Sequence, residues 1–313
     1  MHMKRFLHII NHRDFVLILA LVTGFLLGER TRPLAEISIW PLGLVMVFAT
    51  TNFSFRSWIP VSNALRPLAI SALLNYGIFG LLVIGLSWFF FHTAAFSIYI
   101  GFVLVAAAPP GPSVIPFSAL LNGDNNFSVS GVFGLHLLAV VLTPLILLVF
   151  LGQALIDPWV ILGIMAQLIL LPLLISRLLR HPRILPRIQH VRNRVIKWGF
   201  FLVITPIVGM GAPVLRTDPV SVLKISGVLL FVMFVMGFLY HVLMHKAKQN
   251  RGFIISSTLM MVIKSSAFAA VTAFAFFPDD ARVALPPAVV SIFVTLFIIL
   301  YSQLVRWQDR KQT

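Results

Sequence analysis

A single lysine lies in the middle of a long apolar stretch. Lys264 is the twelfth of the 25 residues from Phe253 to Phe277, and residues 259–263 before it are all apolar. Inside a membrane-spanning helix an unpaired ammonium at this depth costs about 2.5–3.5 kcal/mol, so such a lysine normally faces the protein interior. It could bind an anion, carry a proton or hydrogen-bond to the carbonyl groups of a broken helix. We therefore predict a functional site around Lys264.

Four prolines and a glycine interrupt another apolar stretch, residues 106–116. These residues are Pro109, Pro110, Gly111, Pro112 and Pro116. A continuous helix cannot pass through them, because proline has no N–H to donate and clashes with the carbonyl four residues earlier. The freed backbone groups cannot face lipid, so the break must face protein or a water-filled cavity. The N–H groups of the next helix, at Ser113, Val114 and Ile115, would form a positive end that suits an anion.

Polar partners for this site are few. All nine Asp and Glu residues lie in tails, in loops or at the ends of apolar segments, so the carboxylate that usually binds sodium or relays protons in a pump is absent from the segments. Other polar residues within apolar segments include Thr50, Asn52, Asn75, Ser128 and His136. Most such residues serve helix packing. Asn75 and His136 lie deepest, and His136 could either carry a proton or serve packing.

The composition identifies an integral membrane protein. Of the 313 residues, 59% are hydrophobic and 11% are charged, whereas an ordinary soluble domain has about 25% charged residues. The absence of cysteine excludes disulfides, thiolate catalysis and cysteine-ligated metals. The sequence lacks a phosphate-binding glycine-rich loop, a zinc helix and a serine nucleophile motif. We predict neither an enzyme nor a resident metal or other cofactor.

Ten apolar segments predict ten membrane-spanning helices. They cover residues 15–28, 37–55, 67–91, 95–121, 127–155, 159–179, 195–214, 220–244, 253–277 and 283–305. With the N-terminus in the cytoplasm, 18 of the 24 basic residues fall on the cytoplasmic side, which favours cytoplasmic N- and C-termini. This bias accounts for the net charge of +15 without a nucleic acid partner. We predict a multi-pass protein of the cytoplasmic (inner) membrane, surrounded by lipid.

A basic loop divides the chain into equal halves. Residues 177–197 carry seven basic side chains and form the longest predicted cytoplasmic loop, with binding of anionic lipid as a secondary role. Five segments precede this loop and five follow it, which defines two halves, residues 1–156 and 157–313. Halves with an odd number of spans insert in opposite orientations, as in many secondary transporters whose corresponding helices are interrupted near the midplane. The prolines lie in the fourth segment and Lys264 in the ninth.

The sequence resembles the bile acid:sodium symporter family over nearly its whole length. The most specific similarity covers Gly101–Pro116 and Leu142-Thr143-Pro144-Leu145, and residues 264–267 with 276–278 resemble the family's ninth and tenth helices. The resemblance implies two inverted five-helix repeats. Helices 1, 2, 6 and 7 would form a panel, and helices 3, 4, 5, 8, 9 and 10 a core in which helices 4 and 9 cross. Family members import organic anions with sodium, by alternating access of a site between panel and core.

The chain departs from this family where sodium binds. In the family's sodium sites the polar residues of helices 4, 5 and 9 supply oxygens, and here their places are taken by Val114, Ile115, Val132, Met260, Lys264 and Ser265. Ser128 remains, and Asn75 stands near a glutamine of helix 3. A sodium ion needs about five or six oxygen ligands, which the apolar replacements cannot supply. Both sodium sites are therefore predicted to be lost.

We hypothesise that the ammonium of Lys264 replaces a bound cation where helices 4 and 9 cross. The predicted function is transport of a small organic anion without sodium, and the anion itself could pair with Lys264. Gain and loss of a proton on the amine could couple transport to protons. One alternative is sodium-coupled symport through sites that differ from those of the family. Another is a membrane receptor that keeps the fold but does not transport. The sequence does not identify protein partners.

Overall fold

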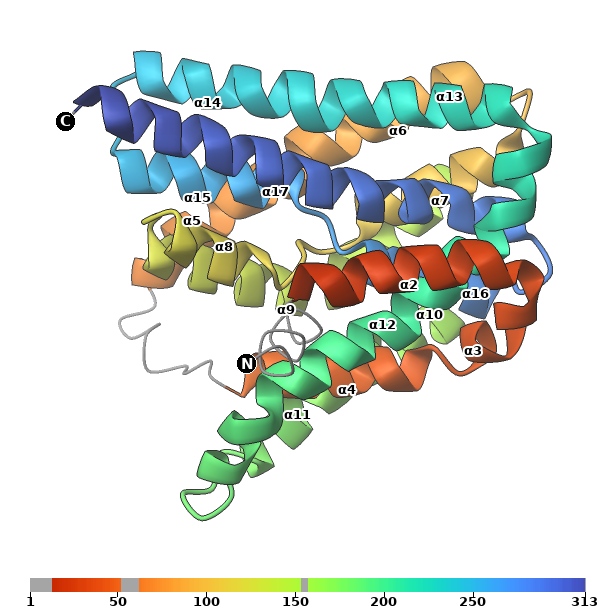
Figure 1. Cartoon of the computed structure of the whole chain (residues 1–313), viewed down its shortest axis with the longest axis horizontal. Coiled ribbons are helices and arrows are strands. Elements are labelled where there is room, and N and C mark those ends of the chain that lie inside the picture. Colours follow the sequence, from red (N-terminus) through yellow and green to blue (C-terminus); the bar gives the residue numbers. More distant parts are fainter. Residues whose placement is uncertain (1–12, 52–61, 153–156, 313) are drawn as a thin grey trace, which may run out of the picture.

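The computed structural model describes residues 13–51, 62–152 and 157–312, and these residues form helices and short connections without a β-strand (Figure 1). Among the residues that the structure describes, six helices are long and apolar enough to cross a membrane: Ala64–Phe91, Asn125–Leu151, Trp159–Leu178, Leu185–Pro213, Pro219–Lys246 and Ala281–Gln308. Ile18–Glu36 and Ile39–Thr50 together form a seventh candidate, bent by 75°. The predicted all-α membrane protein is confirmed, whereas ten spans in an inverted repeat stay a prediction.

One group of helices packs around the longest helix, and we call it the α12 group. Its members are α2 (Arg13–Leu27), η1 (Gly28–Thr31), α3 (Arg32–Glu36), α4 (Ile39–Thr50), α10 (Pro158–Met165), the π-helical turn η4 (Ala166–Leu170), α11 (Leu171–Leu178) and α12 (Leu185–Thr217). The first four of these elements contact α12 directly, and α11 packs on α4. In Figure 1, α2 and α12 run beside one another.

A second group packs around α7 (Phe96–Ala107), and we call it the α7 group. Its other members are α5 (Ser62–Ala72), the π-helix η3 (Leu73–Gly80), α6 (Leu81–Phe91), α8 (Val114–Leu120), α9 (Asn125–Leu151), α13 (Pro219–Leu229), the π-helix η5 (Leu230–Val235), α14 (Met236–Lys246), α15 (Arg251–Val262), α16 (Ser266–Phe276), η6 (Ala281–Ala284) and α17 (Leu285–Gln312). Every side chain from Ile98 to Ala107 is buried. A helix that is apolar on all faces has to be surrounded by protein or by lipid, and here α6, α9, α16 and α17 cover it.

The helix α12 begins ten residues earlier than predicted. It starts at Leu185 rather than at residue 195, so only residues 179–184 separate it from α11, and the prediction of a long loop over 177–197 is wrong. Arginine lowers the hydropathy of this stretch but has a high helix propensity. Apolar residues at 185, 188, 191 and 195 also keep a helical spacing. The hairpin of α11 and α12 projects from the rest of the described chain (Figure 1).

The molecule has two chemically different ends (Figure 1). The turn between α14 and α15, the end of α17 and the α11–α12 hairpin carry many of the basic residues, and we call this the basic end. At the opposite end lie η1, α3, the start of α13 and the loop from α16 to η6. These segments carry acidic as well as basic residues, among them Glu36, Asp218 and Asp279.

The close packing of α7 depends on a glycine. A Cβ atom at Gly101 would overlap the carbonyl oxygen of Val283 and the ring of Pro286. We therefore expect Gly101→Ala to lower the free energy of unfolding by about 1–3 kcal/mol, because backbone must move. Gly85→Ala is the control, since its added Cβ has no atom within 4 Å apart from neighbouring residues and the backbone of its own helix turn. The melting temperature of the detergent-purified protein measures both effects, and equal values for the two variants would contradict the prediction.

Candidate functional site

Two helix breaks meet in the interior of the α7 group. The chain leaves α7 at Ala107 and resumes at α8, and it leaves α15 at Val262 and resumes at α16. The N–H of Gly111 donates to the carbonyl of Ile263 at 3.0 Å, and the N–H of Ser265 donates to the carbonyl of Pro109 at 3.0 Å. These bonds form an antiparallel bridge between Pro110 and Lys264. Each break therefore satisfies backbone groups that the other leaves free.

The side chain of Lys264 is enclosed at this crossing. It is only 2% exposed, and its Nζ donates to Oδ1 of Asn75 at 2.7 Å and to the carbonyls of Ala106 and Ala108 at 2.8 Å each. An ammonium has three donors, and all three have acceptors here. The acceptors belong to the protein, so this geometry leaves no ammonium donor for a substrate.

The prolines explain why those two carbonyls are available. In a helix the carbonyls of Ala106 and Ala108 would accept from the residues four positions later, which are Pro110 and Pro112 and have no N–H. Lys264 supplies the missing donors. The carbonyl of Ala107, which lies between them, accepts from the hydroxyl of Thr143 at 2.7 Å. A cation also complements the negative end of the α7 dipole.

A π-helical turn positions the remaining partners of the lysine. Asn75, Tyr76 and Phe79 all lie on η3, and all three contact the Nζ atom of Lys264. The amide nitrogen of Asn75 donates to the carbonyl of Met260 at 3.2 Å, which fixes its oxygen toward Lys264. The Nζ atom lies 4.6 Å from the ring centroid of Tyr76 and 5.5 Å from that of Phe79. Both rings add cation–π attraction.

Other residues predicted for the site have different roles in the structure. Ser265 caps α16 by accepting from the N–H of Phe268 at 3.4 Å. The hydroxyl of Ser128 donates to the carbonyl of Asp124 at the start of α9, and no contact joins it to Lys264. Val114 is fully buried. Asn52 lies outside the described residues, so its predicted role stays a prediction.

A cavity of about 540 Å³ lies between the two helix groups toward the basic end. Residues of α4 and α12 line one side, and residues of α8 and α9 line the other. The predicted site residues Thr50, Pro112, Ser113, Ile115 and His136 all border it. The ring Nδ1 of His136 is hydrogen-bonded to the carbonyl of Val132 at 2.7 Å, and the hydroxyl of Thr50 donates to that of Met46 at 2.8 Å.

A second cavity, of about 120 Å³, lies on the other side of the first helix break. It is bordered by α2 and α12 of one group and by α16 and α17 of the other. Its polar lining consists mainly of hydroxyl groups, from Ser113, Ser265, Ser266, Ser291 and Thr295. Pro112, Ser113 and Phe200 border both cavities, so the break separates the two spaces.

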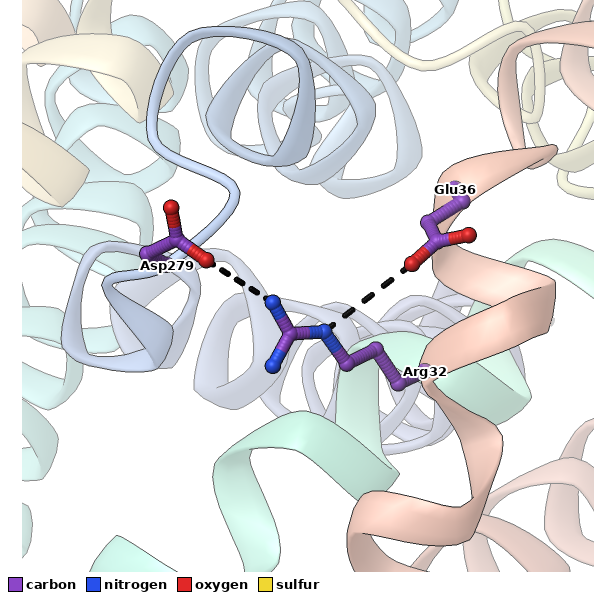
Figure 2. A network of polar contacts seen from close by, with 3 residues as sticks. All are labelled: Arg32, Glu36 and Asp279. Carbon is purple, nitrogen blue, oxygen red and sulfur yellow. Dashed lines mark hydrogen bonds and ion pairs between the residues drawn. The ribbon is translucent and has the colours of Figure 1, made fainter.

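An ion pair joins the two groups at the opposite end. Nη2 of Arg32, the first residue of α3, donates to a carboxylate oxygen of Asp279 at 2.8 Å, and its Nε lies 3.9 Å from Glu36 of the same helix (Figure 2). Asp279 belongs to the loop between α16 and η6. The side chains are 53% and 88% exposed, so the pair contributes little to stability. The pair links the α12 group to the α7 group on the side away from the larger cavity.

Several functional groups were not predicted from the sequence. Carbonyl groups of the broken helix are among the predicted partners of Lys264, but side-chain patterns do not show which carbonyls accept. The rings of Tyr76 and Phe79 look like ordinary helix packing. The sequence predicts a topology signal and, secondarily, lipid binding for Arg192 and Lys197, whereas both line the larger cavity. A signal for Arg192 is present in the sequence, because residues 192, 196 and 200 recur at intervals of four, which is the spacing of one helix face.

Comparison with known proteins agrees with this architecture. The sequence model of the sodium bile acid symporter family matches residues 40–216, which is more than half of the chain. The matched part extends from α4 into α12 and includes the first helix break and much of the larger cavity, whereas Lys264 lies outside it. No curated protein matches the chain. From the extent of the family match, the chain belongs to the sodium bile acid symporter family.

Proposed function

We propose that the protein is a secondary transporter of a small organic anion that works without sodium, with Lys264 in the place of a bound cation. Membership of the sodium bile acid symporter family supports a transport function. The observation that carries the sodium-independent part is the coordination of Nζ by three oxygen atoms at 2.7–2.8 Å. The ammonium thus holds a positive charge among three oxygen atoms, fewer than the five or six that a sodium ion needs, so the crossing requires no external cation.

The two helix groups suggest how the transporter moves. In this proposal the α12 group is the panel, the α7 group is the core, and residues 1–156 and 157–313 are inverted repeats. The larger cavity lies toward the basic end, which the positive-inside rule places in the cytoplasm of a cytoplasmic membrane. The pair between Arg32 and Asp279 joins the groups at the other end. The structure then corresponds to a state whose site is accessible from the cytoplasm.

A lysine that stays protonated throughout the cycle removes the need for a coupling ion. No external cation has to bind at the crossing before the core can move, so the protein would act as a uniporter or an exchanger. Exchange of a proton on the amine during the cycle would instead couple transport to protons. The first possibility has the more direct support, because Lys264 is enclosed and all its donors are bonded.

Sodium should therefore leave the wild-type protein unchanged. A ligand that binds only the folded state at 100 times its Kd stabilises it by about 2.7 kcal/mol. We expect no difference in melting temperature between sodium chloride and choline chloride at equal ionic strength. In proteoliposomes, uptake of taurocholate should likewise be equal with and without a sodium gradient. A saturable rise in melting temperature with sodium would indicate sodium symport, and binding without accumulation would indicate a receptor.

A further inference from the structure

We infer that two copies of this protein associate in the membrane through the exposed face of α4 and α11, with Gln167 of each copy at the centre of the contact. A groove of about 270 Å³ runs along this face. Residues of α4 line one side of it, and residues of η4 and α11 line the other. The groove shares no lining residue with either cavity between the helix groups, so the inference does not rest on the proposed transport function.

Gln167 is a polar residue in an otherwise apolar span. It is the ninth of the 20 residues from Trp159 to Leu178, and all the other residues from 160 to 175 are apolar. Gln167 is exposed and borders the groove, and within the described part of the chain its side chain has no hydrogen-bond partner. An amide in this position is unfavourable in lipid alone, because hydrocarbon neither donates nor accepts hydrogen bonds.

The depth of Gln167 excludes a lipid head group as its partner. With a rise of 1.5 Å per residue, the helix places it roughly 12 Å from Trp159 and roughly 16 Å from Leu178. Head groups lie at the ends of such a span, and acyl chains surround its middle. The partner must therefore bring a hydrogen-bonding group to the centre of the membrane, as a second membrane-spanning helix does.

A second copy of the chain supplies such a group at the same depth. Both copies insert in the same orientation, because the basic residues that set the orientation are identical. A two-fold axis perpendicular to the membrane then places one Gln167 opposite the other. A primary amide carries two donors and an acceptor, so two such amides form a reciprocal pair of hydrogen bonds. A single polar residue in an apolar seam also fixes the register of the two helices.

The surroundings of Gln167 suit close contact with another helix. Trp40 and Leu44 of α4 are 71% and 49% exposed and border the groove, as does Leu171 of α11, which is 46% exposed. Gly163 lies about one turn before Gln167, and a Cβ atom added there has no atom within 4 Å apart from neighbouring residues and the backbone of its own helix turn. Small residues let helix backbones approach one another in membranes. Side chains of the second copy would therefore fill the groove while the two amides meet.

The proposed contact involves one helix group only. All the residues that line the groove belong to the α12 group. In Figure 1, α4 and α11 lie on the side of the molecule away from α14 and α17 of the α7 group. Association through this face therefore joins the α12 groups of two copies and leaves each α7 group free to move against its own α12 group.

Cross-linking in membranes tests this contact, because the chain has no cysteine of its own. Gly163→Cys places one thiol per copy beside Gln167 and keeps the amide. We expect a bis-methanethiosulfonate linker to convert most of this variant into a dimer of twice 34.9 kDa. Gly227→Cys is the matched control, since Gly227 is exposed, has the same free space and lies on α13 of the α7 group. The control should stay monomeric.

Two further variants separate the amide of Gln167 from the apolar groove. Adding Gln167→Leu to Gly163→Cys keeps an apolar side chain of similar size but removes the hydrogen bonds. The protein-to-lipid ratio that gives half-maximal cross-linking in proteoliposomes should then rise about tenfold. Adding Gln167→Asn instead retains an amide and should keep most of the cross-linking. The melting temperature should not fall in the leucine variant, because Gln167 bonds to no other described residue.

Three results would overturn the inference. Equal cross-linking with and without Gln167→Leu would contradict the role of the amide. Equal cross-linking of Gly163→Cys and Gly227→Cys would indicate random collision rather than a defined face. A wild-type protein that is monomeric in native mass spectrometry and retains bound phospholipid would assign the groove to lipid. None of these readouts depends on transport, so a failure to accumulate an organic anion would contradict the proposed function alone.

Discussion

Replacing Lys264 by alanine should abolish transport and make the stability of the protein depend on sodium. The substitution leaves Oδ1 of Asn75 and the carbonyls of Ala106 and Ala108 without their donor. Each buried acceptor that loses its partner costs about 1–3 kcal/mol, so the free energy of unfolding should fall by about 3 kcal/mol or more. A sodium ion in the vacated space would have these three oxygens as ligands, and water molecules would complete the five or six that it needs. The melting temperature in sodium chloride should then exceed that in choline chloride.

Two further variants separate the charge from the volume of the side chain. Lys264→Gln keeps an amide group with two N–H donors, so it should be more stable than Lys264→Ala but equally inactive in uptake of taurocholate by proteoliposomes. Lys224→Ala makes the same change of charge at an exposed position on α13 and should be neutral. Wild-type uptake by Lys264→Gln would contradict the proposed role of the ammonium. Sodium-independent stability of Lys264→Ala would show that the crossing cannot hold an external cation.

Linking α3 to the α16–η6 loop should stop transport completely. The chain has no cysteine, so Arg32→Cys with Asp279→Cys gives two unique thiols in an otherwise unchanged protein. A reducible bis-methanethiosulfonate linker can replace the ion pair that joins the two groups (Figure 2). If the groups must separate at this end in every cycle, the linked protein cannot turn over. We expect uptake to fall to background after linking and to recover after reduction.

The same ion-pair network supplies the control for the linker. Arg32→Cys with Glu36→Cys places both thiols on α3, four residues apart, so a link between them constrains only that helix. This pair should react equally well and keep its activity. Full activity of the linked Arg32→Cys, Asp279→Cys protein would show that the opposite end does not open. The ion pair alone should matter little, because exposed pairs contribute about 0–1 kcal/mol.

The sequence predicts the first helix break well and the second one poorly. Four prolines make the break after Ala107 unavoidable, because proline removes backbone donors wherever it stands. No proline or glycine lies between Met260 and Ser266, so local sequence does not explain why α15 ends at Val262. That break is held by hydrogen bonds from Gly111 and to Pro109, which are distant in sequence. Tertiary contacts of this kind cannot be inferred from helix propensity.

The sequence predicts Lys264 at the centre of the site, but it does not predict which side chains line the larger cavity. The depth of Lys264 in an apolar segment was sufficient to single it out, and carbonyl groups of a broken helix were one of the partners considered. The orientation of Arg192 and Lys197 depends on the rotation of α12 about its axis, which is set by packing against α2 and α4. Hydropathy also does not predict the early start of α12, because it describes how favourably a segment enters lipid and not whether the segment is helical.

The positive charge of Lys264 is part of the protein and cannot dissociate, and this has an electrical consequence. A sodium ion that travels with an anion compensates its charge and is released, whereas the lysine returns with the protein at the end of each cycle. Under the proposed function, the charge moved per cycle is therefore that of the anion alone. A membrane potential that is negative inside opposes entry of one such charge by about 2.3 kcal/mol per 100 mV and favours its exit by the same amount. Replacing a mobile cation by a fixed one thus biases a uniporter of this design toward export.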